Sequence, residues 1–514
     1  MLVMLAIYLL RIDRVAGLMV DDAWYVLLAK ALAEGQGYRI ISSAVAQILP
    51  GYPPGFPGIL SLVFRVNPRF PENVWLLKSV SIAAMMGVAA LSYAYCRRYR
   101  RLPRELAASI AIAVTISPAF VFLATSTVMT ECVFTLTQLG AIALIHRCVE
   151  SPDERRSRVS AILAGSLAAV TLLIRSSGIA LIAAAMLWFL KERLVKRAVL
   201  FAVVVMVCLL PWLIYARAHT PTYEERAAHR GSIAWAYGDQ FWMRWAGAPA
   251  SGQITLADLP ARVKNNLVDV FGRDVGGIIL PVAFRGPSES GQEVVALGGM
   301  VGLMAASMGG AWPTMVISFL LSGIALVGFV QALRERVTVA ELLVPISLAI
   351  IAVWPYWSFR FVLPLAPYLF LYFVKGMQTV VPLEPLRVAR IAMAVVIGLS
   401  IFDNAQYILL ARDPARLNSL SWIADAEEVE AALEWMNTHL ENEGVIASTN
   451  PALVYLRTGR TAVAFDDPPN DWKSWRRRGV RYVACLFPLE LPASSNGEYK
   501  VLYRSPGRLW IIEI

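Results

Sequence analysis

Residues 198–215 read AVLFAVVVMVCLLPWLIY, a run without charge that directly follows the basic segment 191–197. A helix of this length crosses the apolar core of a bilayer, which is about 30 Å thick. Backbone groups in lipid must be paired within their own segment, so the run predicts a transmembrane helix. The composition agrees, because 57% of the residues are hydrophobic and 16% are charged, against about 25% charged in soluble domains. The chain is therefore expected to be an α-helical polytopic membrane protein.

The basic residues gather in three links between apolar runs, at 97–104, 147–158 and 191–197. Lysine and arginine favour cytoplasmic loops, so these links place the N-terminus inside and the C-terminus outside the cell. The net charge of +10 then reflects membrane topology and gives no reason to expect nucleic-acid binding. We expect about 11 spans, the first of them with a beginning upstream of Met1. The expected spans are 1–18, 74–96, 105–124, 128–146, 159–174, 178–190, 198–215, 312–331, 339–355, 360–378 and 390–410.

Two domains are expected from the change of composition near Ala411. Residues 1–410 form the membrane domain, with outer loops at 19–73 and 216–293. Segment 294–311 is either a re-entrant piece or the upper part of the next helix. Residues 411–514 form a small soluble extracytoplasmic α/β domain, because an amphipathic helix is followed by short β-rich runs. The helix is expected at 426–440 and the strands at 445–447, 462–465, 481–486, 499–503 and 509–512.

The first outer loop opens with an acidic pair in the stretch 21–32, DDAWYVLLAKAL. Trp24, Leu27 and Leu28 recur at helical spacing and predict an apolar stripe lying along the membrane surface. An aspartate at a helix start can cap free N–H groups, which would explain one of the two acids. A second carboxylate at the mouth of a membrane costs desolvation and needs a further reason. Capping and catalysis both remain open for Asp21 and Asp22.

A second feature of this loop is the stretch 49–58, LPGYPPGFPG. So many prolines and glycines interrupt both helices and strands, so the segment is a stiff, bent return to the membrane. On local physics alone a structural turn is the simpler interpretation.

Three charged residues are expected at outer helix ends. Arg175 and Arg360 either extend their charges to the interface or bind an anion. Glu131 either pairs with Arg175 or serves a site directly, because an acid in a span is costly. His219 and His229 do not form a metal signature, and the five scattered cysteines predict neither a disulfide framework nor a metal pair.

Several stretches resemble one family in their order along most of the chain. The acidic pair is followed by EGQGY at 34–38 and by the PP-containing return, then by TLLIRSSG at 171–178, RFVLPLAP at 360–367 and NPALVYLRTGR at 450–460. This order is similar to the GT-C superfamily, in the branch of protein O-mannosyltransferases and lipid A aminoarabinose transferases (glycosyltransferase family 39-like). Two positions depart from that branch. Asp22 stands where glutamate is usual, and Tyr52 precedes PP where aminoarabinose transferases often have lysine or histidine.

The resemblance implies an inverting hexosyl- or pentosyltransferase of the inner membrane. The donor would be a polyprenyl-phosphate sugar, and the acceptor a glycan, lipid or protein outside the cytoplasm. Asp21 would be the base, supported by Asp22, which alternatively binds the donor sugar. Arg360, with Arg175, would hold the lipid phosphate. Tyr52, Glu131 and Tyr25 would line the cavity, and a divalent metal is possible but not indicated.

Two other classes fit part of the pattern. A transporter or lipid flippase would explain the spans and the intramembrane charges, but it is expected to show broken helices at the midplane and internal repeats. We find no repeat in the sequence. A structural assembly subunit with a degenerate site is the other possibility.

Overall fold

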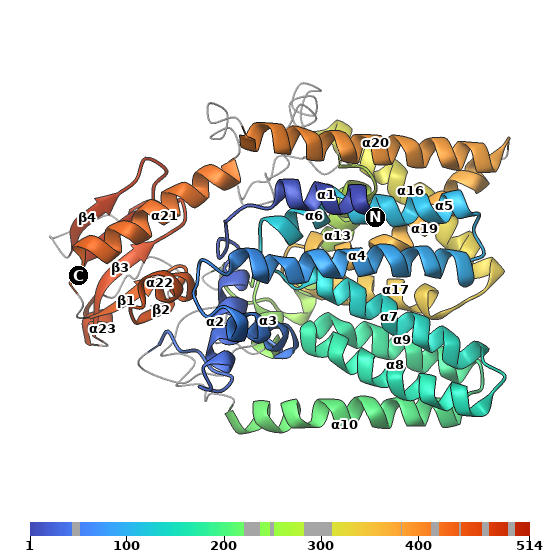
Figure 1. Cartoon of the computed structure of the whole chain (residues 1–514), viewed down its shortest axis with the longest axis horizontal. Coiled ribbons are helices and arrows are strands. Elements are labelled where there is room, and N and C mark those ends of the chain that lie inside the picture. Colours follow the sequence, from blue (N-terminus) through green and yellow to red (C-terminus); the bar gives the residue numbers. More distant parts are fainter. Residues whose placement is uncertain are drawn as a thin grey trace.

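A computed structural model describes residues 1–43, 52–219, 237–246, 251–281, 311–381, 383–412, 421–441, 444–464, 472–477, 479–491 and 499–514. Long helices run side by side, and a small sheet lies beyond one end of them (Figure 1). His229 and nearly all of segment 294–311 lie outside the described residues, so the expectations for them stay untested.

Seven described helical segments are long and apolar enough to cross a membrane. They confirm the corresponding expected spans, and an eighth consists of α5 (Arg104–Ile116) and α6 (Pro118–Thr125), bent by 46°. The chain is therefore a multi-pass membrane protein. The seven are α4 (Val74–Arg98), α7 (Glu131–Glu150), α8 (Glu154–Ile174), α10 (Val195–His219), α16 (Ala311–Glu335), α20 (Pro385–Arg412) and the segment made of α18 (Phe359–Val362), η7 (Leu363–Leu365) and α19 (Ala366–Val380).

The other expected spans are shorter apolar helices: α1 (Leu2–Arg11), α9 (Ile179–Lys191) and α17 (Val339–Val353). The first span was expected to continue to residue 18. This prediction is wrong in extent, because the helix ends at Arg11. The carboxylate of Asp13 accepts hydrogen bonds from the Val15 N–H at 2.9 Å and from Lys78 Nζ at 2.7 Å. These bonds to the side chain compete with helix formation and turn the chain.

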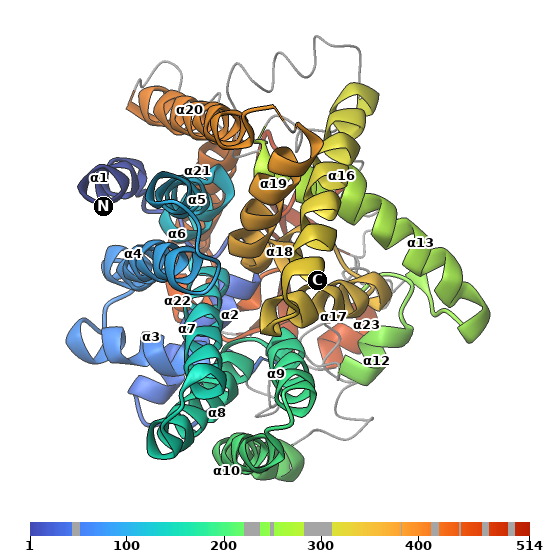
Figure 2. The same ribbon diagram turned by 90° about the vertical axis from the view of Figure 1, so that its right-hand side faces the viewer.

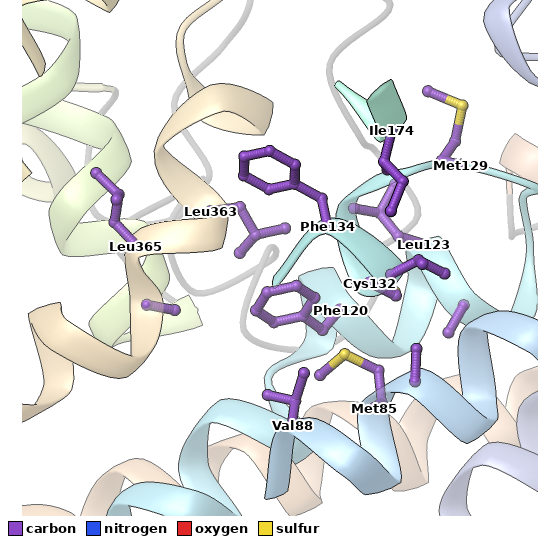
Figure 3. Close-up of a cluster of buried hydrophobic side chains, with 14 of the residues drawn as sticks. Met85, Val88, Phe120, Leu123, Met129, Cys132, Phe134, Ile174, Leu363 and Leu365 are labelled. Atoms are coloured by element: carbon purple, nitrogen blue, oxygen red, sulfur yellow. The ribbon is translucent and has the colours of Figure 1, made fainter. Parts of the chain in front are cut away.

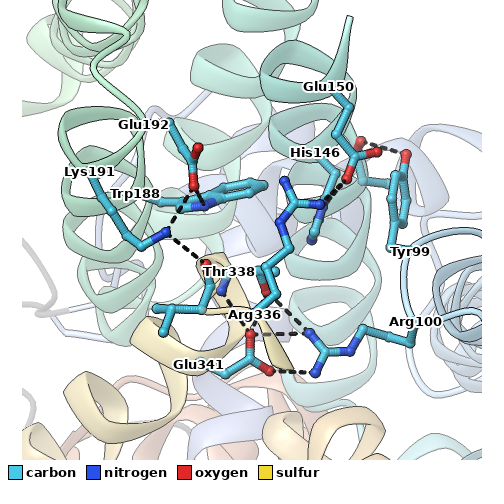
Figure 4. A network of polar contacts seen from close by, with 12 residues as sticks. Tyr99, Arg100, His146, Glu150, Trp188, Lys191, Glu192, Arg336, Thr338 and Glu341 are labelled. Carbon is cyan, nitrogen blue, oxygen red and sulfur yellow. Dashed lines mark hydrogen bonds and ion pairs between the residues drawn. The ribbon is translucent and has the colours of Figure 1, made fainter. Parts of the chain in front are cut away.

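The two ends of the bundle differ in character. The three basic links lie at the end away from the sheet, and we call this the basic end (Figure 1). A polar network joins helix ends there (Figure 4). Arg100 pairs with Glu341 at 2.9 Å with both side chains almost fully buried, and Arg336 pairs with Glu150 at 3.2 Å. These ion pairs fix the α4–α5 link and the starts and ends of neighbouring spans relative to one another.

The opposite end carries α2 (Asp21–Ala33) and α3 (Gly55–Val66), and we call it the α2 end. Figure 2 views the molecule along the bundle and shows the spans arranged around a central group that includes α7, α18 and α19. Part of the segment 216–293 forms short helices at this end. They are α12 (Tyr237–Trp242), α13 (Leu259–Asp269), the π-helical turn η5 (Val270–Asp274) and α14 (Val275–Ile279).

An apolar cluster joins α4, α6, α7 and η7 (Figure 3). Met85 from α4, Phe120 from α6, Cys132 from α7 and Leu363 from η7 are each fully buried. Close-packed interiors resist small displacements. The cluster therefore holds the start of α7 and the segment α18–η7 in fixed positions, and these two segments carry Glu131 and Arg360.

The C-terminal region, residues 421–514, combines helix α21 (Ser421–His439) with a five-stranded sheet of order β2-β1-β3-β5-β4. Strands β1, β2 and β3 pair in parallel, whereas β5 pairs antiparallel with β3 and β4. The expected helix and all five expected strands are confirmed. The elements are β1 (Val445–Ser448), α22 (Pro451–Thr458), β2 (Ala462–Ala464), α23 (Trp472–Arg477), β3 (Val480–Cys485), β4 (Lys500–Arg504) and β5 (Trp510–Glu513).

Candidate functional site

Helix α2 presents Asp21 at its first turn without using it as a cap. The capping residue is Val20, whose side chain cannot accept a hydrogen bond, and the free N–H of Ala23 is bonded by Asp22 and not by Asp21. The Asp21 side chain is 29% exposed. Of the two interpretations left open by the sequence, the capping role is therefore absent for Asp21.

The rest of α2 is buried on nearly all sides, including Trp24, Leu27 and Leu28. The sequence predicted a single apolar stripe on a membrane surface, and this is wrong in extent. Helices α3 and α22 pack against α2 and cover the sides that a surface helix would leave open. Asp21 therefore projects from a well-fixed element.

Both carboxylate oxygens of Asp21 have partners. The hydroxyl of Tyr52 donates to Oδ1 at 2.6 Å, and the guanidinium of Arg360 donates through NH1 to Oδ2 at 3.1 Å. Tyr52 comes from the proline-rich return and Arg360 from α18. The structure thus joins three segments that are far apart in the sequence.

Arg360 also contacts the acid at the start of α7. Its Nε donates to Glu131 Oε1 at 2.8 Å, and Arg175 NH1 donates to the same oxygen at 2.6 Å. The Arg175 guanidinium lies 4.4 Å from the centre of the Phe361 ring. The pairing of Glu131 with Arg175 is present, and it belongs to the same cluster as Asp21. We call Asp21, Arg360, Glu131 and Arg175 the charge cluster.

Four tyrosine side chains, Tyr25, Tyr52, Tyr237 and Tyr356, lie near this cluster. The Tyr25 ring lies 5.0 Å from the Tyr52 ring. Tyr356, in the link before α18, is buried, and this burial together with the negative charge of Asp21 raises the pKa of Tyr356 to about 12. Tyr237 of α12 accepts a hydrogen bond from the Ser176 hydroxyl at 2.8 Å, beside Arg175. These phenols supply hydrogen-bonding groups and flat apolar faces, as sugar ligands require.

The proline-rich return is positioned by a close backbone approach. Any Cβ on Gly55 would come within 2.7 Å of the Leu173 backbone at the end of α8, so only glycine fits there. The Tyr38 hydroxyl donates to the Tyr52 carbonyl at 2.9 Å. Tyr38, Leu173 and Trp212 also line an open groove of about 300 Å³. This mostly apolar groove therefore lies beside the return that carries Tyr52, at the ends of α8 and α10.

Asp22 does not join the cluster. It is completely buried, and its oxygens accept the backbone N–H groups of Gly17 at 2.8 Å and Ala23 at 3.0 Å. Burial raises the pKa of Asp22 to about 6, although the Gly17 hydrogen bond opposes this shift. Its contacts are those of an anchor between α2 and the preceding loop.

Sequence reasoning missed the residues that hold Arg360 in place. Ser358, just before α18, donates to the buried carboxyl of Asp274 on the π-helical turn η5. Burial raises the pKa of Asp274 to about 7. No sequence pattern marked this pair.

A signal was present for the buried charge of Lys78. A single charge inside an apolar span predicts a buried partner, and that partner is Asp13.

Within the described residues, no group of three or more His, Cys, Asp or Glu side chains could hold a metal ion. His219 stacks on Tyr215, with ring centroids 4.1 Å apart, and its Nδ1 lies 2.8 Å from the Tyr215 carbonyl oxygen. The oxygens of Asp21 and the Oε1 of Glu131 are already engaged by the protein's own donors.

No known protein-family profile matches the sequence, and no curated protein sequence matches it. Solved structures do resemble the fold. The aminoarabinose transferase ArnT of Cupriavidus metallidurans in the apo state matches over 99% of this chain and 96% of its own, with a TM-score of 0.58 and 12% identity. The oligosaccharyltransferase of Archaeoglobus fulgidus matches over 90% of this chain and 63% of its own, with a TM-score of 0.49 and 14% identity.

The mycobacterial arabinofuranosyltransferase AftD matches over 99% of this chain and 39% of its own, with a TM-score of 0.43 and 12% identity. The match to ArnT, whose TM-score is above 0.5, shows that the chain has a GT-C-like fold, a polytopic helical membrane body with a small C-terminal α/β region. The resemblance inferred from the sequence is confirmed at the level of the fold.

Two carboxylates of the cluster are predicted to differ in their effect on stability. Glu131 is fully buried between two guanidinium groups, so Glu131→Gln leaves buried positive charge and lowers the free energy of unfolding by about 3–5 kcal/mol. Asp21→Asn removes a partly exposed partner and costs about 1 kcal/mol. Thermal unfolding of both variants in one detergent measures the difference. Equal shifts would contradict the buried role of Glu131.

The buried carboxyl of Asp22 predicts a pH-dependent stability. Its pKa is about 6 in the folded protein and about 3.9 in an unfolded chain. The folded state therefore binds the proton more tightly, and this stabilisation is complete below pH ~4 and is lost as the pH rises through ~6, by roughly 3 kcal/mol. The Asp22→Asn variant lacks this titration. The melting temperature of the wild type minus that of the variant should fall between pH 4.5 and 7.5, and a constant difference would contradict the assignment.

Proposed function

We propose that the protein is an inverting membrane glycosyltransferase that moves a hexosyl or pentosyl group from a polyprenyl-phosphate donor to an extracytoplasmic glycan, lipid or protein. The observation that supports this most directly is the contact of 3.1 Å between Asp21 and Arg360. It brings a partly exposed carboxylate together with a cation that suits phosphate, at one end of a membrane bundle. The GT-C-like fold shared with ArnT supports the same class.

The reaction needs a base and a cation that binds phosphate. A sugar hydroxyl is a weak nucleophile, so a base must take its proton during attack on C1 of the donor sugar. Asp21 takes that proton as the new C1–O bond forms. The bond from C1 to the phosphate oxygen breaks, and the polyprenyl phosphate leaves with the electron pair. Attack opposite the leaving group inverts the configuration at C1.

Arg360 and Arg175 provide the charge that the leaving group requires. The phosphodiester of the donor carries one negative charge, and the departing phosphate monoester gains a second as the bond breaks. Guanidinium groups aimed at this oxygen therefore bind the transition state more strongly than the ground state. Glu131 holds both arginines in place, and Tyr25 and Tyr52 line the sugar site.

The shared guanidinium also predicts an order of binding. Asp21 Oδ2 accepts from Arg360 and Oδ1 accepts from Tyr52, so each oxygen of the base already accepts one hydrogen bond, and hydrogen bonds to a carboxylate favour its ionised form. A donor phosphate competes with Asp21 for Arg360. Its binding draws NH1 away from Oδ2 and leaves that oxygen to receive the acceptor proton. The donor thus binds before the acceptor in a productive cycle.

The location follows from charge and apolar surface. The basic end faces the cytoplasm of the inner membrane, by the preference of lysine and arginine for that side, and the α2 end faces outward. The isoprenoid tail lies along the groove beside Tyr38 and Trp212. Asp22 supports Asp21 through the helix start, and the C-terminal region covers the acceptor.

Replacing the base is predicted to separate catalysis from donor binding. Asp21→Asn lowers kcat by about 100-fold or more, because general-base assistance is lost. Binding of undecaprenyl phosphate stays equal or tightens, because the phosphate no longer competes with a carboxylate for Arg360. Transfer of label from a panel of polyprenyl-phosphate sugars in membranes measures the first effect, and calorimetry measures the second. Glu72→Gln, at an exposed acid near the start of α4, is the control, and equal transfer by both variants would exclude Asp21 as the base.

The phosphate-binding role is tested by Arg360→Lys. Lysine keeps the charge but cannot donate to Glu131 and to a second anion through a planar fork. Affinity for undecaprenyl phosphate should fall by about 10-fold or more, the effect of one lost charge-assisted hydrogen bond. The exposed Arg69 provides the control as Arg69→Lys. Unchanged affinity in the Arg360 variant would place the phosphate elsewhere.

A further inference from the structure

The segments on both sides of α2 are tied to the C-terminal region. Before the helix, the Gly17 carbonyl accepts a hydrogen bond from Asn450 Nδ2 at 2.6 Å. After the helix, the Ser42 carbonyl accepts one from the Ala462 N–H of strand β2 at 2.7 Å. Helix α22 also packs directly against α2 (Figure 1). The element that carries Asp21 is therefore held at both ends and along one side by residues more than four hundred positions away in the chain.

Asn450 is oriented for this contact by its own surroundings. It is 1% exposed, and its Oδ1 accepts the Leu453 N–H at 3.2 Å as the cap of α22. Its own N–H donates to the Ser448 hydroxyl at 3.1 Å. The side-chain oxygen of Asn450 must face the Leu453 N–H, which is a donor, and its NH₂ group must face the Gly17 carbonyl, which is an acceptor. The side-chain amide of Asn450 therefore has one satisfactory orientation.

Gly17 connects Asn450 to the acidic pair, because it also bonds to Asp22. Its N–H donates to Asp22 Oδ2 at 2.8 Å, in the first turn of α2. Its φ of +95° suits glycine, and any Cβ there would come within 2.7 Å of the Leu453 side chain. The path from Asn450 through Gly17 to Asp22 thus consists of two hydrogen bonds inside a closely packed contact.

The start of α2 needs such support from outside. Its N-cap residue, Val20, has no polar side chain to bond the free N–H groups and has a φ of 61°. A β-branched residue rarely adopts that conformation, so the loop does not hold this geometry by local preference. Meanwhile Asp21 must keep its position relative to Arg360, which lies 3.1 Å from Oδ2. A shift of about 1 Å at a reacting group can lower a rate by about 100-fold.

We propose that Asn450 is a positioning residue for the acidic pair: through Gly17 it fixes the first turn of α2 and thereby the place of Asp21 relative to Arg360. The C-terminal region is then part of the machinery of the site as well as a cover above it. The structural part of this proposal stands alone, whereas its effect on turnover rests on the proposed function.

The substitution Asn450→Asp isolates the contact. Aspartate caps a helix as well as asparagine does, so the bond to Leu453 is kept. The donor to Gly17 is lost, and a carboxylate oxygen faces the Gly17 carbonyl instead. The matched control is Asn437→Asp on α21, because Asn437 is exposed and its Nδ2 lies 3.5 Å from the Arg457 carbonyl oxygen.

Three measurements on the full chain in detergent test the proposal. Hydrogen–deuterium exchange of residues 17–28 should become about 5-fold faster in the Asn450 variant, which corresponds to one lost hydrogen bond, and should not change in the control. The affinity for undecaprenyl phosphate should stay near that of the wild type, and the melting temperature should fall by only a few degrees, as expected for one lost hydrogen bond. In the label-transfer assay, kcat should fall by about 10-fold or more at an unchanged KM for the donor.

The outcomes separate this proposal from the proposed function. Unchanged exchange at residues 17–28 would overturn the positioning role, whatever the activity. Faster exchange with unchanged kcat would also overturn it, because the first turn would then move without consequence. Faster exchange in a protein whose wild type transfers no sugar would support the contact between the two regions and count against glycosyl transfer.

Discussion

The guanidinium of Arg360, shared between Asp21 and Glu131, is the interaction on which the rest of the site depends. A charge at the end of a membrane bundle is expensive to bury unless it is paired. Arg360 is bonded to two carboxylates, and Arg175 is bonded to the same oxygen of Glu131, so each of the four charged groups has a partner. The cluster has no net formal charge, yet its exposed edge retains a carboxylate and a guanidinium that a ligand can reach.

The helical bundle holds the residues of the charge cluster in fixed positions. Apolar packing among α4, α6, α7 and η7 fixes the start of α7 and the segment that follows α18 (Figure 3). The hydrogen bond between Ser358 and Asp274 secures the approach to α18 from the other side. The polar network at the basic end likewise fixes the opposite helix ends relative to one another (Figure 4). Catalytic groups need positions held to within about 0.5 Å, which rigid helices provide better than loops.

Sequence patterns predicted the elements well where one physical signal dominated. Long uncharged runs such as 198–215 predicted the spans, and short β-rich runs predicted the five C-terminal strands. The first helix was predicted too long, because hydropathy does not register that Asp13 turns the chain by binding Val15 and Lys78. The burial of α2 on nearly all sides was also missed, since the covering helix α22 comes from the other end of the chain.

For the candidate site, too, the sequence predicted one part and missed another. By itself, the sequence determined the residue types and their helix ends: an acid pair after the first apolar segment, a stiff return with Tyr52, and arginines where spans emerge. Only the tertiary structure decided that Asp21 faces Arg360 while its neighbour Asp22 is buried against Gly17. Adjacent residues on a helix point about 100° apart, so two identical side chains meet different surroundings. Those surroundings are built from segments whose meeting depends on long-range packing, which local sequence does not encode.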